Sequence, residues 1–175
     1  FSTENWKRAE EEVGFIMGLV KKYLMAEIEF YKQNRIRIRH AGDMDGLPAD
    51  VASEIRQVCR ETEAFTGTTV VLALNYGGRD EIVRAVRRLL RGGAGAAELT
   101  EAAVAGALDN PDIPDPDLII RPAAEYRSSN FLLWQSAYSE FHFSEKFWPD
   151  WTEEDLRLAV ADYQKRERRF GGVGR

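Results

Sequence analysis

The sequence contains a single cysteine, Cys59, among 175 residues, and it has no long uninterrupted apolar run. One thiol excludes an internal disulfide and leaves no second cysteine for a zinc site, so a reducing cytoplasm suits the chain. A membrane-spanning helix needs about 20 consecutive apolar residues, which no stretch approaches. Basic residues are outnumbered, with 24 Lys and Arg against 29 Asp and Glu, which argues against a general nucleic-acid binder. We therefore expect a cytoplasmic protein with no nucleic-acid partner.

What the chain does have is the composition of an ordinary folded domain, with 44% hydrophobic and 30% charged residues. A chain of this length can bury a core, and we expect one domain over residues 1–175. The sequence begins with FSTENW instead of methionine, at what reads as the end of a strand, and Ser2 or Thr3 is available to cap the helix that follows. We expect the natural protein to begin further upstream.

Helix-like and strand-like segments alternate along the chain without an internal repeat. Helices are predicted over about residues 10–32, in LPADVASEIRQVCRETEAF and GGRDEIVRAVRRLL, over residues 99–108, and in TEEDLRLAVADYQKRERRF, the last capped by Thr152. Strands are predicted in RIRIRHAGD, TTVVLALNY and DIPDPDLIIR, with shorter apolar elements in FLLWQ and EFHFS. This order predicts an α/β fold with a mostly parallel central sheet flanked by helices. The apolar run TTVVLALNY predicts a strand that is covered on both faces.

The helix expected over residues 10–32 has an unusually wide apolar stripe, which includes Phe15, Ile16, Leu19 and Val20. Such a stripe is most often ordinary core, but it would also suit a pocket for a hydrocarbon tail. The pattern leaves both interpretations open.

Charged residues interrupt an apolar region in LIIRPAAEYRSSNFLLWQ, directly after a predicted strand. Open α/β sheets bind their ligands at the carboxyl ends of strands, so chemistry is expected here. Arg121 and Arg127 offer two guanidinium groups suited to a phosphate, and Ser129 adds a hydroxyl donor. Glu125 lies between them, where it can hold an arginine in place or assist with a metal. The alternative interpretation is a structural knot of salt bridges.

Three other segments are basic or rich in glycine. NYGGRDE places paired glycines between a strand and a helix, where backbone amides can meet an anion, although a tight turn needs the same glycines. It lacks the G-x-G-x-x-G spacing of a nucleotide-binding domain. RERRFGG is typical of a basic helix terminus, and we interpret the arginines of the helix near residues 84–91 as a solvated face. Several phosphate-capable segments together favour a diphosphate ligand.

Five segments keep the order and spacing of a known family: FSTENWKR, ALNYGGRDEIVRAVR, PDPDLIIRPAAEYRSSNFLLWQSAYSEFHF, WPDW and RRFGG. They resemble the cis-prenyltransferases, the family of undecaprenyl and decaprenyl diphosphate synthases. The resemblance implies condensation of isopentenyl diphosphate onto an allylic diphosphate primer, geranyl or farnesyl, with a new Z double bond at each step. It also implies magnesium, a homodimer and a hydrophobic substrate tunnel. The trans-prenyltransferases match less well because their D-D-x-x-D motif is absent.

The resemblance assigns roles to residues of the charged segment. Arg121, Arg127 and Ser129 resemble the residues that bind the diphosphate of isopentenyl diphosphate. Glu140 resembles the acid that ligates magnesium near the subunit boundary, where carboxylate and phosphate oxygens suit a hard divalent ion.

Further site residues are implied at both ends of the chain. The family's mobile substrate loop, whose polar groups assist removal of a proton from the condensing substrate, is matched by Ser2, Asn5, Trp6 and Arg8. The C-terminal Arg-x-Gly element, which reaches a substrate phosphate across the dimer, is matched by Arg169 and Gly171. The resemblance therefore implies catalytic roles for Asn5, Arg121 and Arg127 and a metal-binding role for Glu140. The residues implied to bind substrate are Ser2, Trp6, Arg8, Arg121, Arg127, Ser129, Arg169 and Gly171.

Two departures from the family bear on activity. The family's loop commonly reads R-T-S-G-E or R-P-S-G-E, and here Ala123 and Ala124 stand in place of the serine and the glycine. The family's D-G-N-G-R segment, which binds the allylic diphosphate, has no counterpart in residues 1–175, so we expect the chain to lack its N-terminal part. A non-catalytic subunit or scaffold of the same fold is therefore the alternative function.

Residues 131–151 hold more aromatic and aliphatic side chains than a short segment is expected to hide within one subunit. This favours a dimer interface, with a dense monomer core as the alternative. The resemblance further implies a lipid carrier precursor for cell-wall synthesis. Because a polyprenyl chain is nearly insoluble in water, we expect its release during transient contact with the inner face of the membrane. Products of ten, eleven or fewer isoprene units all remain open.

Overall fold

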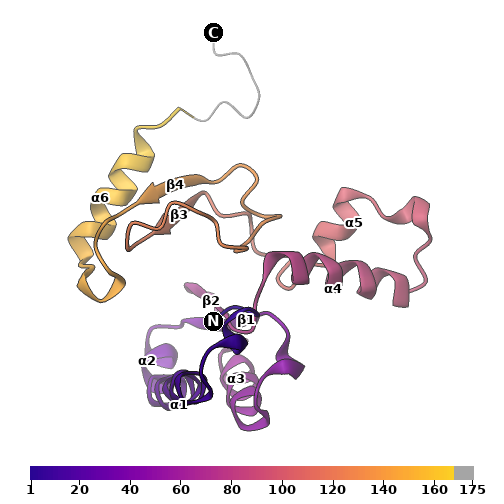
Figure 1. The fold of residues 1–175 in the computed structure, drawn as a ribbon, viewed down its shortest axis with the longest axis horizontal. Coiled ribbons are helices and arrows are strands. Elements are labelled where there is room, and N and C mark those ends of the chain that lie inside the picture. Colours follow the sequence, from indigo (N-terminus) through magenta and orange to yellow (C-terminus); the bar gives the residue numbers. More distant parts are fainter. Residues whose placement is uncertain (168–175) are drawn as a thin grey trace. The chain divides into compact units, whose positions relative to one another are not determined.

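The computed structural model describes residues 1–167 of the chain. The chain forms two compact units, Phe1–Asp112 and a second that begins at Ile113, and each is described by itself (Figure 1). The first unit contains helices α1 (Glu10–Ala26), α2 (Ile28–Gln33), α3 (Ala49–Thr62), α4 (Gly78–Arg91) and α5 (Glu101–Gly106), with strands β1 (Arg37–Ala41) and β2 (Thr69–Ala73). The second contains strands β3 (Leu118–Arg121) and β4 (Glu140–Phe143) and helix α6 (Glu153–Gln164).

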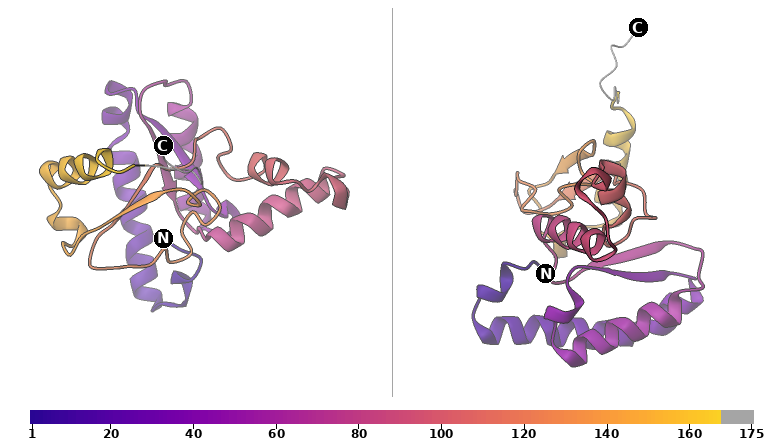
Figure 2. Two further views of the ribbon diagram at one scale, coloured as in Figure 1. Left: turned by 90° about the horizontal axis from the view of Figure 1, so that it is seen from above. Right: turned by 90° about the vertical axis from the view of Figure 1, so that its right-hand side faces the viewer.

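Strands β1 and β2 run parallel, with Arg37 opposite Thr69 and Ala41 opposite Ala73. Helices α1, α2 and α3 cover one face of this pair (Figures 1 and 2). Helix α3 lies between the two strands in the chain and supplies the long crossover connection that parallel pairing requires. The carboxyl ends of both strands therefore meet at one edge, next to the loops that follow Ala41 and Ala73.

The core of the first unit forms where α1 and α3 meet the strands. Helix α3 buries side chains at helical spacing, and these pack with residues from α1 and β1. The core cluster is Met17, Leu24, Ile38, Leu47, Val51, Ala52, Ile55 and Val58. At the end of α3, the fully buried hydroxyl of Thr62 accepts a hydrogen bond of 2.9 Å from the Ile38 amide and donates to the Val58 carbonyl at 2.8 Å. Thr62 thus joins the helix to the strand.

Helices α4 and α5 pack against each other, and Asp109 follows them in the chain. The Asp109 carboxylate accepts two hydrogen bonds from Arg84, at 2.5 and 2.7 Å, and one from the Gly42 amide at 2.8 Å. Burial alone would raise the pKa of Asp109, but Arg84 and Arg88 hold it below its ordinary value. Arg84 and Arg88 therefore anchor the loop after β1, which corrects the interpretation of a purely solvated arginine face.

Strands β3 and β4 of the second unit are also parallel, with Leu118 opposite Glu140 and Arg121 opposite Phe143. Helix α6 packs against β4. Thr152 is the N-cap of this helix, as predicted. Its hydroxyl accepts a hydrogen bond from the Asp155 amide, and the Asp155 carboxylate accepts one of 2.8 Å from the Thr152 amide. Two pairs of parallel strands, with helices α3, α4 and α5 between successive strands of the chain as far as β3, confirm the predicted α/β class.

Several local predictions need correction. The helix expected over residues 10–32 is broken at Glu27, and the break lets Ile28 and Tyr31 pack against the core. Ser2 and Thr3 do not cap α1, because Ala9 holds that position without a side-chain cap. The first two residues of β2 are exposed, so this strand is not covered along its whole length. The segment FLLWQ forms turns.

None of the helices within residues 1–167 combines the length and apolar character needed to cross a bilayer.

Candidate active site

The predicted diphosphate cluster forms at the carboxyl end of β3. Arg121 is the last residue of the strand, and its Nη2 donates a hydrogen bond of 3.3 Å to the Ser129 hydroxyl. The Glu125 carboxylate lies 3.9 Å from the same Nη2 and contacts the guanidinium of Arg127 directly. The structure therefore brings together the four polar residues that the sequence singled out in this segment.

The two arginines of this cluster differ in the exposure of their side chains, and one of them has a buried nitrogen that lacks a hydrogen-bond partner among the described residues. The Arg127 side chain is 68% exposed, whereas that of Arg121 is 22% exposed. The Nε of Arg121 is buried, and within residues 1–167 it has no hydrogen-bond acceptor. An unpaired buried donor on a charged group is costly, and an anionic oxygen beside it would remove that cost. An anionic ligand beside Arg121 would thus relieve an unfavourable feature of the cluster.

The backbone of the loop after β3 adopts an uncommon conformation. Ala123 and Ala124 have φ values of 62° and 53°, in the left-handed region that favours glycine. Their amides donate hydrogen bonds to the carbonyls of Lys146 at 2.8 Å and Ser144 at 2.9 Å. These bonds fix the loop to the segment after β4. Alanine thus stands in a left-handed conformation at both positions, including the one where the family commonly has glycine.

The residues predicted from FSTENWKR gather in the first unit. Ser2 pairs with Tyr76 beyond the end of β2, and its amide donates a hydrogen bond of 2.7 Å to the Asn5 side-chain oxygen. Asn5 begins a short 3-10 helix, Asn5–Lys7. Trp6 donates from its indole Nε1 to the Asn75 side-chain oxygen at 2.6 Å. Arg8 forms an exposed ion pair of 2.6 Å with Glu12.

Glu140 begins β4, and its carboxylate accepts a hydrogen bond of 2.9 Å from Arg166. In the strand register Glu140 pairs with Leu118, three residues before Arg121, so at about 3.3 Å per residue the two lie at opposite ends of the strand pair. Within one chain, Glu140 therefore does not join the Arg121 cluster. Arg169 and Gly171 lie outside the described residues.

A metal site built from protein ligands alone does not form in the part of the chain that the structure describes, where no three His, Cys, Asp or Glu side chains gather. Magnesium in proteins commonly binds through one or two carboxylates together with water and substrate phosphates. Glu140 fits that pattern only as a single ligand, and Arg166 holds one of its two oxygens.

The glycines of NYGGRDE serve the turn between β2 and α4. Gly77 precedes the first helical residue and Gly78 begins α4, with no positive φ at either position. The interpretation of these glycines as a tight turn between strand and helix is therefore better supported than the interpretation as an anion-binding loop. What the sequence reasoning missed is Asn75, the first residue of the motif, which is 5% exposed and has a φ of 51°. Asparagine is among the few residues that adopt this conformation readily, and that signal was present in the sequence.

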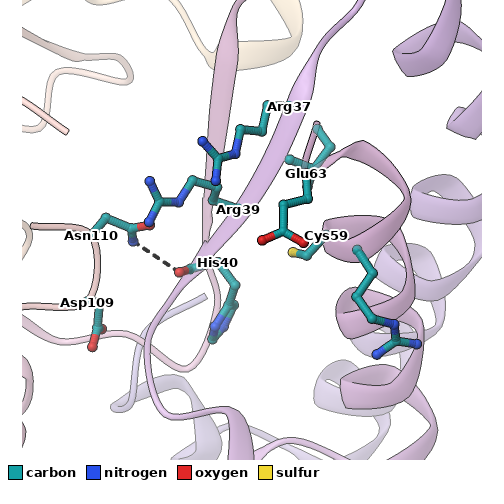
Figure 3. Close-up of a pocket in the computed structure, with 9 residues that line it drawn as sticks. Arg37, Arg39, His40, Cys59, Glu63, Asp109 and Asn110 are labelled. Carbon is teal, nitrogen blue, oxygen red and sulfur yellow. Dashed lines mark hydrogen bonds between the residues drawn. The ribbon is translucent and has the colours of Figure 1, made fainter. Parts of the chain in front are cut away.

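A polar pocket of about 310 Å³ lies beside β1 in the first unit (Figure 3). Arg37 and Arg39 extend from the strand in the same direction, and Asn110 donates a hydrogen bond of 3.0 Å to the His40 carbonyl. Burial lowers the pKa of His40 and raises that of Cys59, so the thiol is not activated as a nucleophile. None of the residues predicted for the active site lines this pocket.

The chain matches the family model described as "Putative undecaprenyl diphosphate synthase" over residues 1–171. The chain belongs to this isoprenyl transferase family. The isoprenyl transferase of Treponema denticola is 53% identical over 173 residues, which cover 99% of this chain and 75% of that protein. The isoprenyl transferase of Thermotoga maritima is 49% identical over 175 residues, covering 99% of this chain and 75% of that protein.

Solved structures of isoprenyl transferases and related enzymes agree with this assignment. A probable undecaprenyl diphosphate synthase from Campylobacter jejuni has a TM-score of 0.90 at 38% identity, covering 98% of this chain and 80% of that one. Lavandulyl diphosphate synthase from Lavandula x intermedia, solved in complex with dimethylallyl diphosphate, has a TM-score of 0.92 at 34% identity, covering 98% and 76%. The protein is a cis-prenyltransferase, as the sequence resemblance implied, and its family elongates prenyl chains.

Proposed function

We propose that this isoprenyl transferase condenses isopentenyl diphosphate with a geranyl or farnesyl diphosphate primer to give a Z-configured polyprenyl diphosphate of the undecaprenyl or decaprenyl type. The observation that carries the proposal is the cluster of Arg121, Glu125, Arg127 and Ser129 at the end of β3, with its buried, unpaired Arg121 Nε. The product would serve as a lipid carrier precursor for cell-wall synthesis.

Arg121, Arg127 and Ser129 bind the diphosphate of isopentenyl diphosphate in this proposal. Arg121 donates from its strand end, and Ser129 accepts from Arg121 while its own hydroxyl proton stays available to a phosphate oxygen. Glu125 orients both guanidinium groups through contacts with each of them. Charge-assisted contacts of this kind fix a diphosphate in position as well as binding it.

Ser2, Asn5, Trp6 and Arg8, all in the first unit, form a separate group of proposed substrate-binding residues. Because the Asn5 side-chain oxygen accepts from the Ser2 amide, the amide nitrogen of Asn5 is the group that it can present to a substrate. Asn5 therefore assists proton removal by donating a hydrogen bond, since an amide is not a base. Arg8 lies on the exposed side of the segment, where its contact with Glu12 can be exchanged for a diphosphate.

Each condensation step forms one carbon–carbon bond. The double bond of isopentenyl diphosphate attacks C1 of the allylic diphosphate, and the C1–oxygen bond breaks with its electron pair leaving on pyrophosphate. A proton then leaves C2 of the isopentenyl unit and restores a double bond, so no covalent enzyme intermediate is needed. The protein contributes positioning and positive charge at the diphosphates.

Glu140 is the proposed protein ligand for magnesium, and the remaining ligands would be water and diphosphate oxygens. Bound there, magnesium would neutralise diphosphate charge. Because Glu140 and Arg121 lie at opposite ends of their strand pair, we propose that they serve the active sites of different protomers. Arg169 and Gly171 are proposed to reach a substrate phosphate across the same boundary.

A homodimer is the proposed assembly. Segment 131–151 exposes large apolar side chains, with Tyr138 at 69%, Phe147 at 65% and Trp148 at 64%. Such residues typify the buried centre of protein interfaces. A Trp148→Glu variant should shift sedimentation toward the monomer and abolish activity, whereas Phe30→Glu, a similarly exposed position on α2, should do neither. An active monomer would contradict the shared site.

We further propose that the enzyme works in the cytoplasm and touches the inner face of the membrane when it releases product. A polyprenyl chain is nearly insoluble in water, so its release is expected to limit turnover and to be accelerated by detergent or lipid. Turnover that is indifferent to both would contradict this part of the proposal.

The direct test is incorporation of radiolabelled isopentenyl diphosphate by the full-length gene product with geranyl or farnesyl diphosphate as primer. The proposal predicts magnesium-dependent labelled polyprenyl diphosphates, whose chain length then identifies the product. A folded protein that incorporates no label with either primer would favour the non-catalytic scaffold instead.

A further inference from the structure

Three segments of the first unit meet at the side chain of Asn75. Its Oδ1 accepts the 2.6 Å hydrogen bond from the Trp6 indole, and its Nδ2 donates a hydrogen bond of 2.8 Å to the Asp43 carbonyl. Asn75 is 5% exposed. One buried amide therefore connects the segment that begins the chain, the loop after β1 and the end of β2.

The backbone around Asn75 makes the same connections. The Asn75 carbonyl accepts from the Asp43 amide at 3.0 Å. On the other side, the Tyr76 amide donates to the Phe1 carbonyl at 3.2 Å, and the Thr3 amide donates to the Tyr76 carbonyl at 3.1 Å. Backbone hydrogen bonds thus hold the chain on both sides of Asn75. The orientation of the Asn75 side-chain amide is set by one donor, the Trp6 indole, and one acceptor, the Asp43 carbonyl.

The loop after β1 packs closely against Asn75. A Cβ atom at Gly46 would collide with its Nδ2, and a Cβ atom at Gly42 would collide with the carbonyls of Leu74 and Asn75. Glycine at both positions therefore lets the loop after β1 close on the amide. Trp6 is held on its other side by edge-on packing against Phe1, with ring centroids 4.8 Å apart.

We propose that Asn75 is a positioning residue for prenyl transfer, which acts through Trp6 by holding the Ser2–Arg8 segment in its substrate-binding arrangement. This inference rests on the proposed function. An asparagine side chain suits the place because it accepts from the indole and donates to the carbonyl at once. Aspartate keeps only the acceptor, and no substrate contact by Asn75 itself is required.

The inference predicts an effect on substrate affinity. Without the Asn75 side-chain amide, the Ser2–Arg8 segment adopts its substrate-binding arrangement only part of the time. The apparent affinity for substrate then falls in proportion to that fraction. The KM for isopentenyl diphosphate should rise about tenfold, with a smaller fall in kcat. The variant for this test is Asn75→Gly, because glycine removes the amide and still accepts a φ of 51°.

A double-mutant cycle separates positioning from general structural damage. Trp6→Phe removes the indole donor but keeps an aromatic ring. If Asn75 acts through Trp6, the double variant should have the same KM as Trp6→Phe alone. Asn110→Ala is the matched control, because it removes one side-chain hydrogen bond, from Asn110 to the His40 carbonyl near the end of β1. This variant should leave the KM for isopentenyl diphosphate unchanged.

A second readout needs no activity. In ¹⁵N-labelled full-length protein, the Trp6 indole N–H, assigned by comparison with Trp6→Phe, should exchange slowly with water. Asn75→Gly should make it exchange at least tenfold faster. Asn75→Asp is the second variant if the glycine variant is unstable, and it should keep the indole protected because it keeps the acceptor.

The outcomes distinguish the inference from the proposed function. Wild-type protein without prenyl transfer would overturn the proposed function. Wild-type activity combined with additive effects of Asn75→Gly and Trp6→Phe on KM, or with an indole that exchanges at the same rate in both proteins, would overturn the positioning role alone.

Discussion

The Nη2 of Arg121 donates a hydrogen bond of 3.3 Å to the hydroxyl of Ser129, across a loop that leaves β3 and turns back toward it. Between them, Glu125 contacts the guanidiniums of both Arg121 and Arg127. The contacts within this loop thus hold its charged groups at the carboxyl end of a parallel strand, the usual ligand edge of an α/β sheet. A diphosphate would meet a preformed cluster there.

The left-handed backbone at Ala123 and Ala124 predicts that glycine stabilises the protein at both positions. Each alanine in this conformation costs about 1–2 kcal/mol, and the greater entropy that glycine loses on folding offsets part of the gain. The double variant Ala123→Gly, Ala124→Gly should raise the free energy of unfolding by about 1 kcal/mol in urea denaturation. Ala161→Gly, in helix α6, should lower it by about as much. Equal losses in both variants would contradict the strain.

The hydroxyl of Thr62 predicts a stability cost in the first unit. In Thr62→Val the side-chain shape is kept, but the buried Ile38 amide loses its acceptor. The expected loss in the free energy of unfolding is about 1–3 kcal/mol by urea denaturation. Thr62→Ser keeps the hydroxyl and serves as the control. A valine variant more stable than the serine variant would show that the hydrogen bond contributes little.

The cap of α6 predicts acid sensitivity. A hydrogen bond from Lys146 and further bonds from Thr152 lower the pKa of Asp155 to about 2, below the value of about 3.9 for an unfolded chain. A folded-state pKa below the unfolded one contributes stability above about pH 4, and this contribution is lost as the pH falls through about 2.

Unfolding of Asp155→Asn should therefore depend less on pH between 5 and 2 than unfolding of the wild type. Lys146→Gln should have an intermediate effect, because the Thr152 bonds remain. Parallel pH profiles for the wild type and Asp155→Asn would show that the carboxylate is not linked to folding.

Glu140→Ala should abolish the response of activity to magnesium while circular dichroism stays unchanged, because it removes the one proposed protein ligand. Arg166→Gln is the matched control: it keeps the carboxylate and removes the cation that occupies one of its oxygens. Its magnesium midpoint should move to lower concentration. An unchanged magnesium titration in Glu140→Ala would exclude Glu140 as a ligand.

Local patterns predicted much of this structure. The spacing of apolar residues located α3 and α4, and the T-x-x-D pattern at Thr152 located the start of α6. The charges after β3 were identifiable because they stand at a strand end. These features depend on residues close together in the sequence, where side-chain spacing decides the structure.

Features that depend on distant contacts were not predicted. The break at Glu27 has no proline or glycine to mark it, and it occurs where Ile28 and Tyr31 turn onto the core. The hydrogen bonds of Asn75 to Trp6 and Asp43 join three separate segments, so no local pattern contains them. The pairing of Glu140 with Arg166 likewise requires β4 and α6 to be packed.

The most direct test of the account is the KM for isopentenyl diphosphate in Arg121→Ala and Arg127→Ala, measured in the full-length enzyme with a saturating allylic primer. Loss of a charge-assisted contact to the diphosphate should raise this KM about 10–100-fold and lower kcat. The KM for the primer should stay within about twofold, and Arg157→Ala, which removes an exposed ion pair on α6, should change neither constant. Wild-type constants for isopentenyl diphosphate in both Arg121→Ala and Arg127→Ala would contradict the assignment of this cluster to its diphosphate.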